Sequence, residues 1–316
     1  MRIVLVDGNN ISFAAQNGPL LTYDGNQVQA IYQSLKMIKS IREHHESDVL
    51  PMILWDSRAQ WRLDILPEYK GKRDENPDIV AMKEEVKRQK PILLEMLTHL
   101  GLHSITVPGY EADDMAGVFT RAAVKSGKEV VLVSGDKDWL QLVQPGVKWL
   151  DVIRVRSCTS KDFEEFTEVE NGRQWLEVKA LMGDKSDCIP GIPGIGDKTA
   201  TRLVKHWGSV DAFLKACRKE GSMIPKDDLP KDLQRAYKKL DAFQGDTALQ
   251  AIYERNVKLM NLIDAVSPNP DVMQSSVVRG QYDLNKFREK CEELAFHSII
   301  EELNTWHKLF YVEKKA

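Results

Sequence analysis

The pattern of hydrophobic and polar positions predicts short strands that alternate with helices. Short apolar runs rich in β-branched residues predict buried strands at 2–6, 51–55, 103–107, 129–133 and 147–152. Hydrophobic residues spaced three and four positions apart predict helices over about 28–42, 111–125, 175–182 and 286–306. Strands that alternate with helices indicate an α/β protein with a mostly parallel central sheet and flanking helices.

Acidic residues follow each of the first four predicted strands. They are Asp7 after the first, Asp56 after the second, Glu111, Asp113 and Asp114 after the third, and Asp136 and Asp138 after the fourth. One such acid is ordinary, because aspartate favours turns and helix caps and complements the helix dipole. Four acidic strand ends in succession need another explanation. Since parallel strands present their carboxyl ends at one edge of a sheet, we expect these side chains to converge there.

Two further acids, Asp184 and Asp187, follow the helix predicted over about 175–182. All nine carboxylates in one cleft would repel one another strongly without cations. Magnesium or manganese ions prefer oxygen ligands, and two such ions roughly 4 Å apart can promote phosphodiester hydrolysis. We therefore predict a two-ion site. On an ideal helix Glu111 and Asp114 share a face, so Asp113 would have to act from the irregular first turn.

A basic and aromatic segment over about 57–90 separates the second and third strands. Its residues of interest are Arg58, Trp61, Arg62, Tyr69, Lys70, Lys72 and Arg73. Two prolines and a glycine interrupt it, so it is not predicted to be one helix. Such a run is usually a solvated loop and a charged helix face. We favour a phosphate-binding arm with aromatic rings that stack on bases, because the segment starts at an acidic strand end.

A stretch rich in glycine and proline, about 188–200, follows the last acidic pair. Its prolines prevent a helix there, whereas Gly194 and Gly196 permit tight turns and close backbone approach. A helix is predicted from about 197, and its first N–H groups can meet a phosphate. The ordinary interpretation is a corner between two helices. The alternative is a DNA-contacting hairpin with the candidate residues Gly191, Gly194, Gly196, Lys198 and Thr199.

Composition limits the class of protein. The 316 residues have room for two domains, and 42% hydrophobic content supports a core. The formal net charge of −3 does not indicate a nucleic-acid binder, but the chain without its nine candidate ligands is basic. Four cysteines lie far apart without zinc-site spacing, which predicts free thiols in a reducing cytoplasm. No apolar run suits a signal peptide or a membrane span, so no membrane association is expected.

Taken together and in order, the motifs resemble those of the bacteriophage-type 5′ nucleases, the flap endonuclease family, which is related to the 5′-nuclease domain of bacterial DNA polymerase I. The resemblance covers the chain from Arg2 to about residue 250. The motifs are Val-Asp-Gly-Asn at 6–9, Leu-Pro-Glu-Tyr-Lys-Gly at 66–71, Glu-Ala-Asp-Asp at 111–114, Ser-Gly-Asp-Lys-Asp-Trp at 134–139, Met-Gly-Asp-Lys-Ser-Asp at 182–187 and Gly-Ile-Pro-Gly-Ile-Gly at 191–196.

The resemblance implies a PIN-like nuclease core over about 1–180 and a helical DNA-binding region over about 181–316. It implies that the segment over about 57–90 forms a helical arch through which a single-stranded 5′ flap threads. The catalytic and gateway positions of the family's arch match Tyr69, Lys70 and Arg73. We also expect Arg58, Arg62 and Lys72 to contact DNA. It also implies a helix-hairpin-helix over about 188–208 that holds duplex DNA and binds potassium.

The resemblance also implies how the acids divide between two ions. The first ion would lie among Asp7, Asp56, Glu111, Asp113 and Asp136. The second would draw on Asp136, Asp138, Asp184 and Asp187, with Asp114 in support. A nearby cationic side chain, Lys70 as first candidate and Arg73 as second, would stabilise charge on the reacting phosphate.

The expected function is that of a structure-specific 5′ nuclease that uses two magnesium or manganese ions and acts on DNA with 5′ flaps or 5′ ends. The protein is expected to be a monomer that acts in trans, with no identified replication partner. A branched-DNA binding protein without catalysis is one alternative. A phosphohydrolase with an aspartyl nucleophile is another, although Asn9 stands where that chemistry usually needs a second aspartate.

Overall fold

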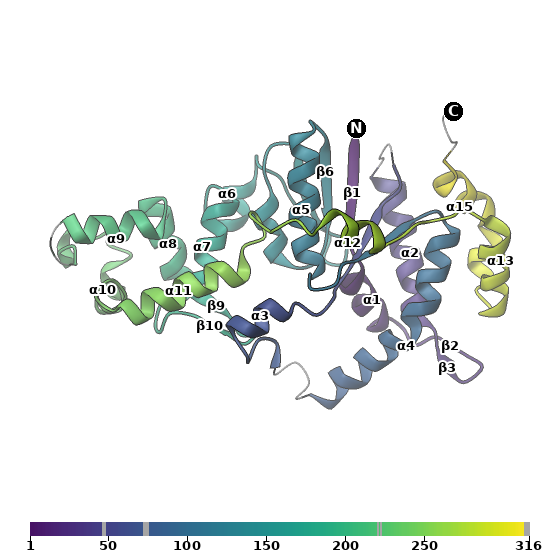
Figure 1. Ribbon diagram of the computed structural model, residues 1–316, viewed down its shortest axis with the longest axis horizontal. Helices are drawn as coiled ribbons and strands as arrows, with labels where there is room; N and C mark the ends of the chain where they lie inside the picture. The colour runs from purple at the N-terminus through teal and green to yellow at the C-terminus, as the bar shows by residue number, and fades with distance from the viewer. Residues whose placement is uncertain (46–48, 72–75, 220, 222, 313–316) are drawn as a thin grey trace.

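The computed structural model describes residues 1–45, 49–71, 76–219, 221 and 223–312. In this part of the chain the largest sheet has seven strands: β1 (Arg2–Asp7), β4 (Met52–Trp55), β5 (His103–Thr106), β6 (Glu129–Val133), β7 (Val147–Asp151), β8 (Arg156–Cys158) and β11 (Val277–Val278). Their order is β11-β5-β4-β1-β6-β7-β8 (Figure 1). The five inner strands are parallel, and both edge strands are antiparallel. The predicted mostly parallel sheet is confirmed.

The inner strands end at nearly the same level. Asp7 of β1 lies opposite Leu54 of β4, and Trp55 of β4 lies opposite Thr106 of β5. The end of β6 is level with the end of β1 in the same way. Side chains that follow these strands therefore emerge together at one edge of the sheet.

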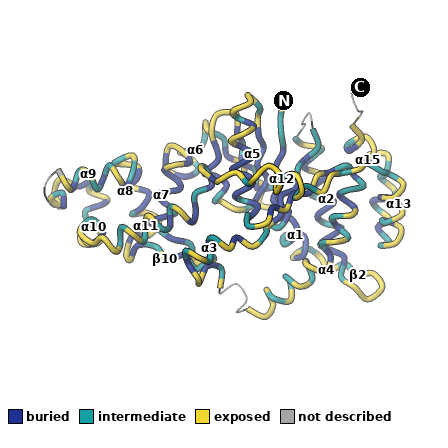
Figure 2. Tube along the Cα trace, viewed as in Figure 1, coloured by how far each residue is buried: buried dark blue, intermediate teal, exposed yellow. Residues whose placement is uncertain are grey.

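Alternate side chains of β1 enter two separate cores. Leu5 packs with α5 (Ala112–Lys125) on one side of the sheet, and Val4 and Val6 pack on the other side. The second side is covered by α1 (Gly8–Gln16), α2 (Gln29–His44) and α4 (Pro77–His99). Figure 2 shows both cores as dark blue segments on the sheet and on the inner faces of these helices.

A group of helices extends to the left of the sheet in Figure 1. They are α7 (Gly172–Met182), α8 (Asp197–Trp207), α9 (Val210–Lys219), α10 (Tyr237–Gly245) and α11 (Thr247–Met260). α7 packs against α8, α11 and η2 (Lys137–Leu142), so it joins this group to the sheet. Two paired strands, β9 (Gly183–Asp184) and β10 (Ile189–Pro190), lie between α7 and α8. The shorter elements are β2 (Thr22–Tyr23), β3 (Asn26–Gln27), α3 (Gln60–Ile65), α6 (Phe163–Thr167), η3 (Lys226–Asp228), η4 (Gln234–Ala236) and α12 (Pro270–Ser275).

The end of the described chain returns to the sheet. β11 pairs with β5, and three helices pack beside α2 and α4: α13 (Leu284–Glu293), α14 (His297–Glu301) and α15 (Leu303–Phe310). The expectation of one closing helix over 286–306 is wrong. The hydrophobic spacing continues, but the chain turns between α13 and α14 at Ala295, whose φ is 54°. The last part of the helical region expected over 181–316 packs beside α2 and α4.

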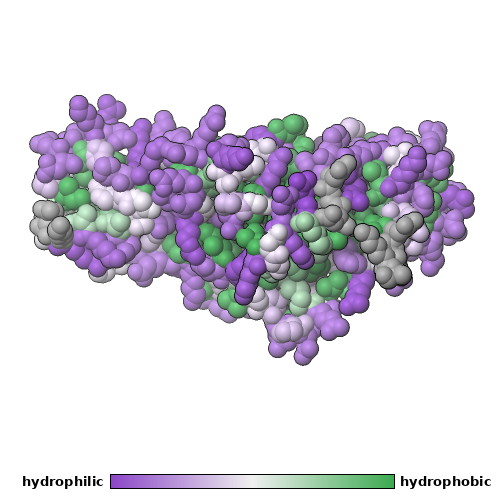
Figure 3. Space-filling view, turned by 90° about the horizontal axis from the view of Figure 1, so that it is seen from above, coloured by the Kyte–Doolittle hydropathy of each residue, from purple (hydrophilic) through white to green (hydrophobic). Residues whose placement is uncertain are grey.

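The surface is mainly hydrophilic. Figure 3, which views the molecule from above, shows purple atoms over most of the face and small, separated hydrophobic patches. Among the described residues, no helix has the length and apolar character needed to cross a bilayer.

Candidate functional site

Asp7 begins an acidic edge at the carboxyl ends of the strands. Its carboxylate caps α1 by accepting a hydrogen bond from the Asn10 N–H (2.9 Å), and its other oxygen accepts one from the Ser134 hydroxyl after β6 (2.8 Å). A Cβ at the next residue, Gly8, would lie 2.7 Å from the indole ring at the end of β4, so glycine is what lets α1 start so close to the sheet. Burial, and then repulsion from Asp56, raises the pKa of Asp7 to about 6.

Asp136 and Asp138 follow β6. Asp136 caps η2 by accepting a hydrogen bond from the Asp138 N–H at 2.8 Å. Asp136 is exposed as a whole residue, but the surrounding protein limits hydration of its carboxylate. This burial, followed by repulsion from Asp138 and Asp7, raises the pKa of Asp136 to about 7. Burial also raises the pKa of Asp138.

The first turn of α5 directs Asp113 toward the other acids. Asp56 accepts a hydrogen bond from the Ala112 N–H at 2.8 Å, so α5 starts over the end of β4. Burial raises the pKa of Asp113 well above its usual value, and repulsion from Asp136 and Asp56 adds to this. Trp139 Nε1 donates to Asp113 Oδ1 at 2.6 Å. Asp113 thus reaches the acidic edge from the first turn of α5.

Arg62 lies inside the protein. Its side chain is 3% exposed, and its guanidinium donates to both oxygens of Asp114 at 2.7 Å. It also lies 3.2 Å from Glu111, and its Nε donates to the Leu259 carbonyl at 3.0 Å. A DNA contact by Arg62 does not fit this arrangement, because its donors face protein acceptors. Asp114 also accepts from the Glu111 N–H at 2.9 Å, so its oxygens are committed to protein partners rather than to an ion.

Tyr69 and Lys70 also bind Glu111. The Tyr69 hydroxyl donates to Glu111 Oε2 at 2.8 Å, and Lys70 Nζ donates to Oε1 at 2.5 Å. Burial and the Glu111 charge raise the pKa of Tyr69, which keeps the phenol protonated as a donor. Lys70 has the left-handed φ of 57°, and its N–H is held by the Asp187 carbonyl at 2.9 Å. This contact joins the segment around 66–71 to the segment that carries Asp184 and Asp187.

Lys179, near the end of α7, is a functional candidate that sequence reasoning missed. Its ammonium lies 3.1 Å from Asp138 and 3.0 Å from Asp184. These two acids raise the pKa of Lys179 against the effect of burial, and the lysine in turn lowers the pKa of Asp184. The sequence signal that could have found it is the position of Lys179 between two buried residues, in the helix that leads to Asp184.

The acidic edge has the donor chemistry for divalent ions. Within the described residues, no three acidic, histidine or cysteine side chains surround a single point closely enough to hold an ion as they stand. Ammonium groups of Lys70 and Lys179 instead lie among the carboxylates. Asp7, Asp113 and Asp136 have raised pKa values and repel one another, which favours a cation among them, and carboxylate oxygens suit hard divalent ions. The residues therefore fit such ions once the lysines and acids adjust.

The described part of the basic segment is not one helix, as predicted. α3 ends at Ile65, and α4 begins at Pro77 with Asn76 as its cap. Arg58 is exposed just before α3. Two candidates, Lys72 and Arg73, lie outside the described residues.

The glycine-rich stretch forms a hairpin before α8. Gly194 has a φ of 79° and is exposed, and Gly196 caps the helix whose first turn carries Lys198 and Thr199. Gly191 does not fit a DNA contact, because a Cβ there would lie 1.9 Å from the Met182 carbonyl; its backbone packs against α7. Asn256, which the sequence did not suggest, binds the hairpin to α7 by donating to the Ala180 and Pro190 carbonyls, each at 2.9 Å.

Two family models account for most of the chain. The 5′-3′ exonuclease N-terminal resolvase-like domain matches residues 2–170. The 5′-3′ exonuclease C-terminal SAM fold matches residues 170–264. The chain belongs to the 5′-3′ exonuclease family. The resemblance inferred from the motifs is confirmed, including the relation to bacterial DNA polymerase I.

Two curated relatives of the chain are longer proteins. The chain is 36% identical over 217 residues to thermostable DNA polymerase I of Thermus filiformis, which covers 68% of the chain and 25% of the relative. It is 28% identical over 316 residues to DNA polymerase I of Streptococcus pneumoniae, which covers 96% of the chain and 33% of the relative. The chain thus spans about a quarter to a third of the curated relatives that it matches.

A solved member of the family has nearly the same extent as this chain. The structure of the bacteriophage T5 5′-exonuclease with bound zinc superposes with a TM-score of 0.68 at 25% identity, and the match covers 93% of this chain and 100% of that one. The core of Rad2 in complex with a DNA substrate shares the fold at 14% identity, with a TM-score of 0.58 and coverage of 99% and 92%. The family fold expected from the sequence is therefore confirmed.

Proposed function

We propose that this member of the 5′-3′ exonuclease family is a structure-specific 5′ nuclease. It hydrolyses DNA phosphodiester bonds near junctions between single strand and duplex, and it degrades 5′ ends. The observation that carries the proposal is the gathering of acidic side chains from β1, β4, α5, η2 and the β9–β10 hairpin at one edge of the sheet. A protein that only bound DNA would gain nothing from anions beside phosphate.

Seven acids hold two magnesium or manganese ions: Asp7, Asp56, Asp113, Asp136, Asp138, Asp184 and Asp187, with Glu111 beside them. When bound, the ions supply an activated water and offset charge on the phosphate. The Lys70 ammonium, now on Glu111, moves onto the phosphate and stabilises its developing charge. Tyr69 and Arg62 hold Glu111 in place. Arg73 is the second candidate for a phosphate contact.

The DNA lies along the acidic edge and the hairpin before α8. Arg58 and Lys72 contact the backbone of the single strand where it enters the arch formed by residues 57–90. Gly194, Gly196, Lys198 and Thr199 contact the duplex through backbone N–H groups and side chains, with a potassium ion at the hairpin. The substrates are 5′ flaps and 5′ ends, and the protein acts as a monomer. The core over about 1–180 cleaves, and the helical region orients the duplex.

Replacement of Asp136 tests the proposal. Asp136→Asn should abolish magnesium-dependent cleavage of a labelled 5′-flap substrate while DNA affinity remains, because the amide keeps the shape but not the charge. The control is Asp211→Asn, since Asp211 is exposed and pairs with Lys215 on α9, away from the strand ends. Cleavage by Asp136→Asn at the wild-type rate would refute the site.

The same assay separates the two alternatives. Binding of the flap without cleavage in magnesium would favour a branched-DNA binding protein. For an aspartyl nucleophile, the wild-type protein should trap a phosphate mimic. The sequence disfavours that chemistry, because Asn9 stands where a second aspartate is usually needed.

A further inference from the structure

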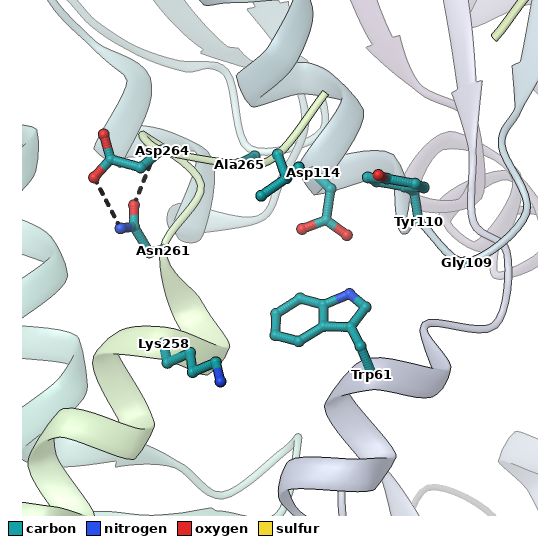
Figure 4. Close-up of a pocket in the computed structure, with 9 residues that line it drawn as sticks. Trp61, Gly109, Tyr110, Asp114, Lys258, Asn261, Asp264 and Ala265 are labelled. Carbon is teal, nitrogen blue, oxygen red and sulfur yellow. Dashed lines mark hydrogen bonds between the residues drawn. The ribbon is translucent and has the colours of Figure 1, made fainter. Parts of the chain in front are cut away.

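A pocket of about 460 Å³ lies between α3, the start of α5 and the end of α11. Its walls include Trp61, Tyr110, Asp114, Lys258, Asn261 and Asp264 (Figure 4). The volume is within the range of roughly 300–1,000 Å³ that is typical of small-molecule sites. The residues that line this pocket include none of the seven acids proposed to hold ions and none of the hairpin before α8. Asp114 lines the pocket and also binds the Glu111 N–H.

The acceptors in the pocket walls are already occupied. Arg62 donates to both oxygens of Asp114. Arg173 donates to both oxygens of Asp264 at 2.8 and 2.9 Å, and Asn261 donates to one of them at 3.0 Å. Each of the two carboxylates is thus paired with an arginine. They do not need a ligand that donates hydrogen bonds, and their negative charge is offset by the arginines.

Three donors in the same walls have no such partner. In the ranges that the structure describes, no hydrogen bond or ion pair is made by Trp61 Nε1, the Tyr110 hydroxyl or Lys258 Nζ. Lys258 is exposed at the end of α11. A ligand that satisfies this set brings acceptor atoms and negative charge. Carbonyl and ring-nitrogen acceptors together with a phosphate are the groups of a nucleotide.

Trp61 offers a flat surface for a base. The guanidinium carbon of Arg62 lies 4.4 Å from the centre of the indole ring, so one face of the ring is fixed by a side chain that Asp114 and Glu111 hold. In Figure 4 the indole lies between Lys258 on one side and Tyr110 on the other, with the Asp114 carboxylate above it. Aromatic side chains that stack on bases are the usual way of binding single-stranded DNA without sequence preference.

We propose that the pocket binds one unpaired nucleotide of the DNA substrate, with its base against Trp61 and its phosphate at Lys258. This inference rests on the proposed nuclease function. The neighbouring Arg62 contacts both the indole and Glu111, so the pocket nucleotide is one side chain away from the acidic edge. A nucleotide held there sets how far the strand extends past the edge, and therefore which bond is cut.

The test uses the full chain with Asp136→Asn, so that bound DNA is not consumed. Flap substrates carry the fluorescent base 2-aminopurine at one unpaired position at a time, and its quenching on an aromatic ring reports stacking. We expect one position to be quenched on binding. Adding Trp61→Leu or Lys258→Ala should abolish this quenching and weaken flap binding about tenfold. With Asp136 restored, both variants should shift the cleavage position.

Matched variants keep the test decisive if Trp61→Leu folds poorly. Trp61→Phe should retain the quenching, and Lys125→Ala, an exposed lysine at the other end of α5, should change neither quenching nor affinity. Unaltered quenching in both Trp61→Leu and Lys258→Ala would overturn the proposal. So would binding of free deoxyadenosine monophosphate in the pocket with no quenching in any strand. Failure of the nuclease function itself would appear separately, as absence of wild-type flap cleavage.

Discussion

Lys179 and Lys205 form ion pairs of similar length in very different surroundings. Lys179 lies about 3 Å from Asp138 and Asp184 with 14% of its side chain exposed, whereas Lys205 lies 2.8 Å from Glu164 with 53% exposed. An exposed pair such as this one contributes little to stability, because water and salt screen it. Removing one partner of a buried pair costs about 3–5 kcal/mol, because a buried charge is left without compensation.

Lys179→Met should therefore destabilise the protein strongly in EDTA. Magnesium should restore more stability to this variant than to the wild type, because the ion then neutralises Asp138 and Asp184 without competition from an ammonium group. Urea unfolding with and without magnesium measures both effects, and Lys205→Met is the matched control. Equal losses in the two variants, or equal responses to magnesium in Lys179→Met and the wild type, would contradict this role.

α5 packs closely against the segment of chain that follows α11. At Gly117 an added Cβ would lie 2.1 Å from the Leu262 carbonyl, so no larger residue fits unless the two segments separate. Gly117→Ala should destabilise the protein by about 1–3 kcal/mol in urea unfolding. Gly245→Ala at the end of α10, where a Cβ meets no atom within 4 Å, should cost little. An unchanged free energy of unfolding in Gly117→Ala would show that the two segments separate easily.

Elements with strong local patterns were predictable. β1 and α5 lie within a residue of the expected 2–6 and 111–125, because their apolar spacing matches the strand and helix periods. β11 was missed, since two valines carry no periodic signal and only the edge of β5 makes them a strand. The three C-terminal helices share one hydrophobic stripe, so the turn at Ala295 left no mark on the pattern.

Stability of the whole protein should depend on pH and on divalent ions together. The pKa values of Asp7 and Asp136 are raised to about 6 and about 7, so the folded protein keeps protons that the unfolded chain releases above about pH 4. Stability contributed by these groups is present at low pH and is lost as pH rises through their folded pKa values. We expect the free energy of unfolding in EDTA to fall between pH 5 and pH 8, and magnesium to restore it at pH 8.

Two comparisons isolate this effect. The pKa of Asp184 is lowered, so its contribution changes only below about pH 4, outside the window. Burial lowers the pKa of His45, which acts in the opposite direction below about pH 6.5. Asp136→Asn should make the urea-unfolding profile less steep between pH 5 and pH 8, while the raised pKa values of Asp7, Asp113 and Asp138 keep part of the slope. A profile as steep as that of the wild type would mean that Asp136 does not carry the raised pKa.

Local patterns along the chain were sufficient for the alternation of strands and helices, and for the placement of acids such as Asp7 and Asp136 directly after strands. These features follow from side-chain period and turn chemistry, which act over a few residues. The partners of Arg62, the inward direction of Asp113 and the place of Lys179 between two acids could be seen only in the folded protein. Each depends on contacts between segments far apart in sequence, and burial there reverses what a charged side chain does on a solvated surface.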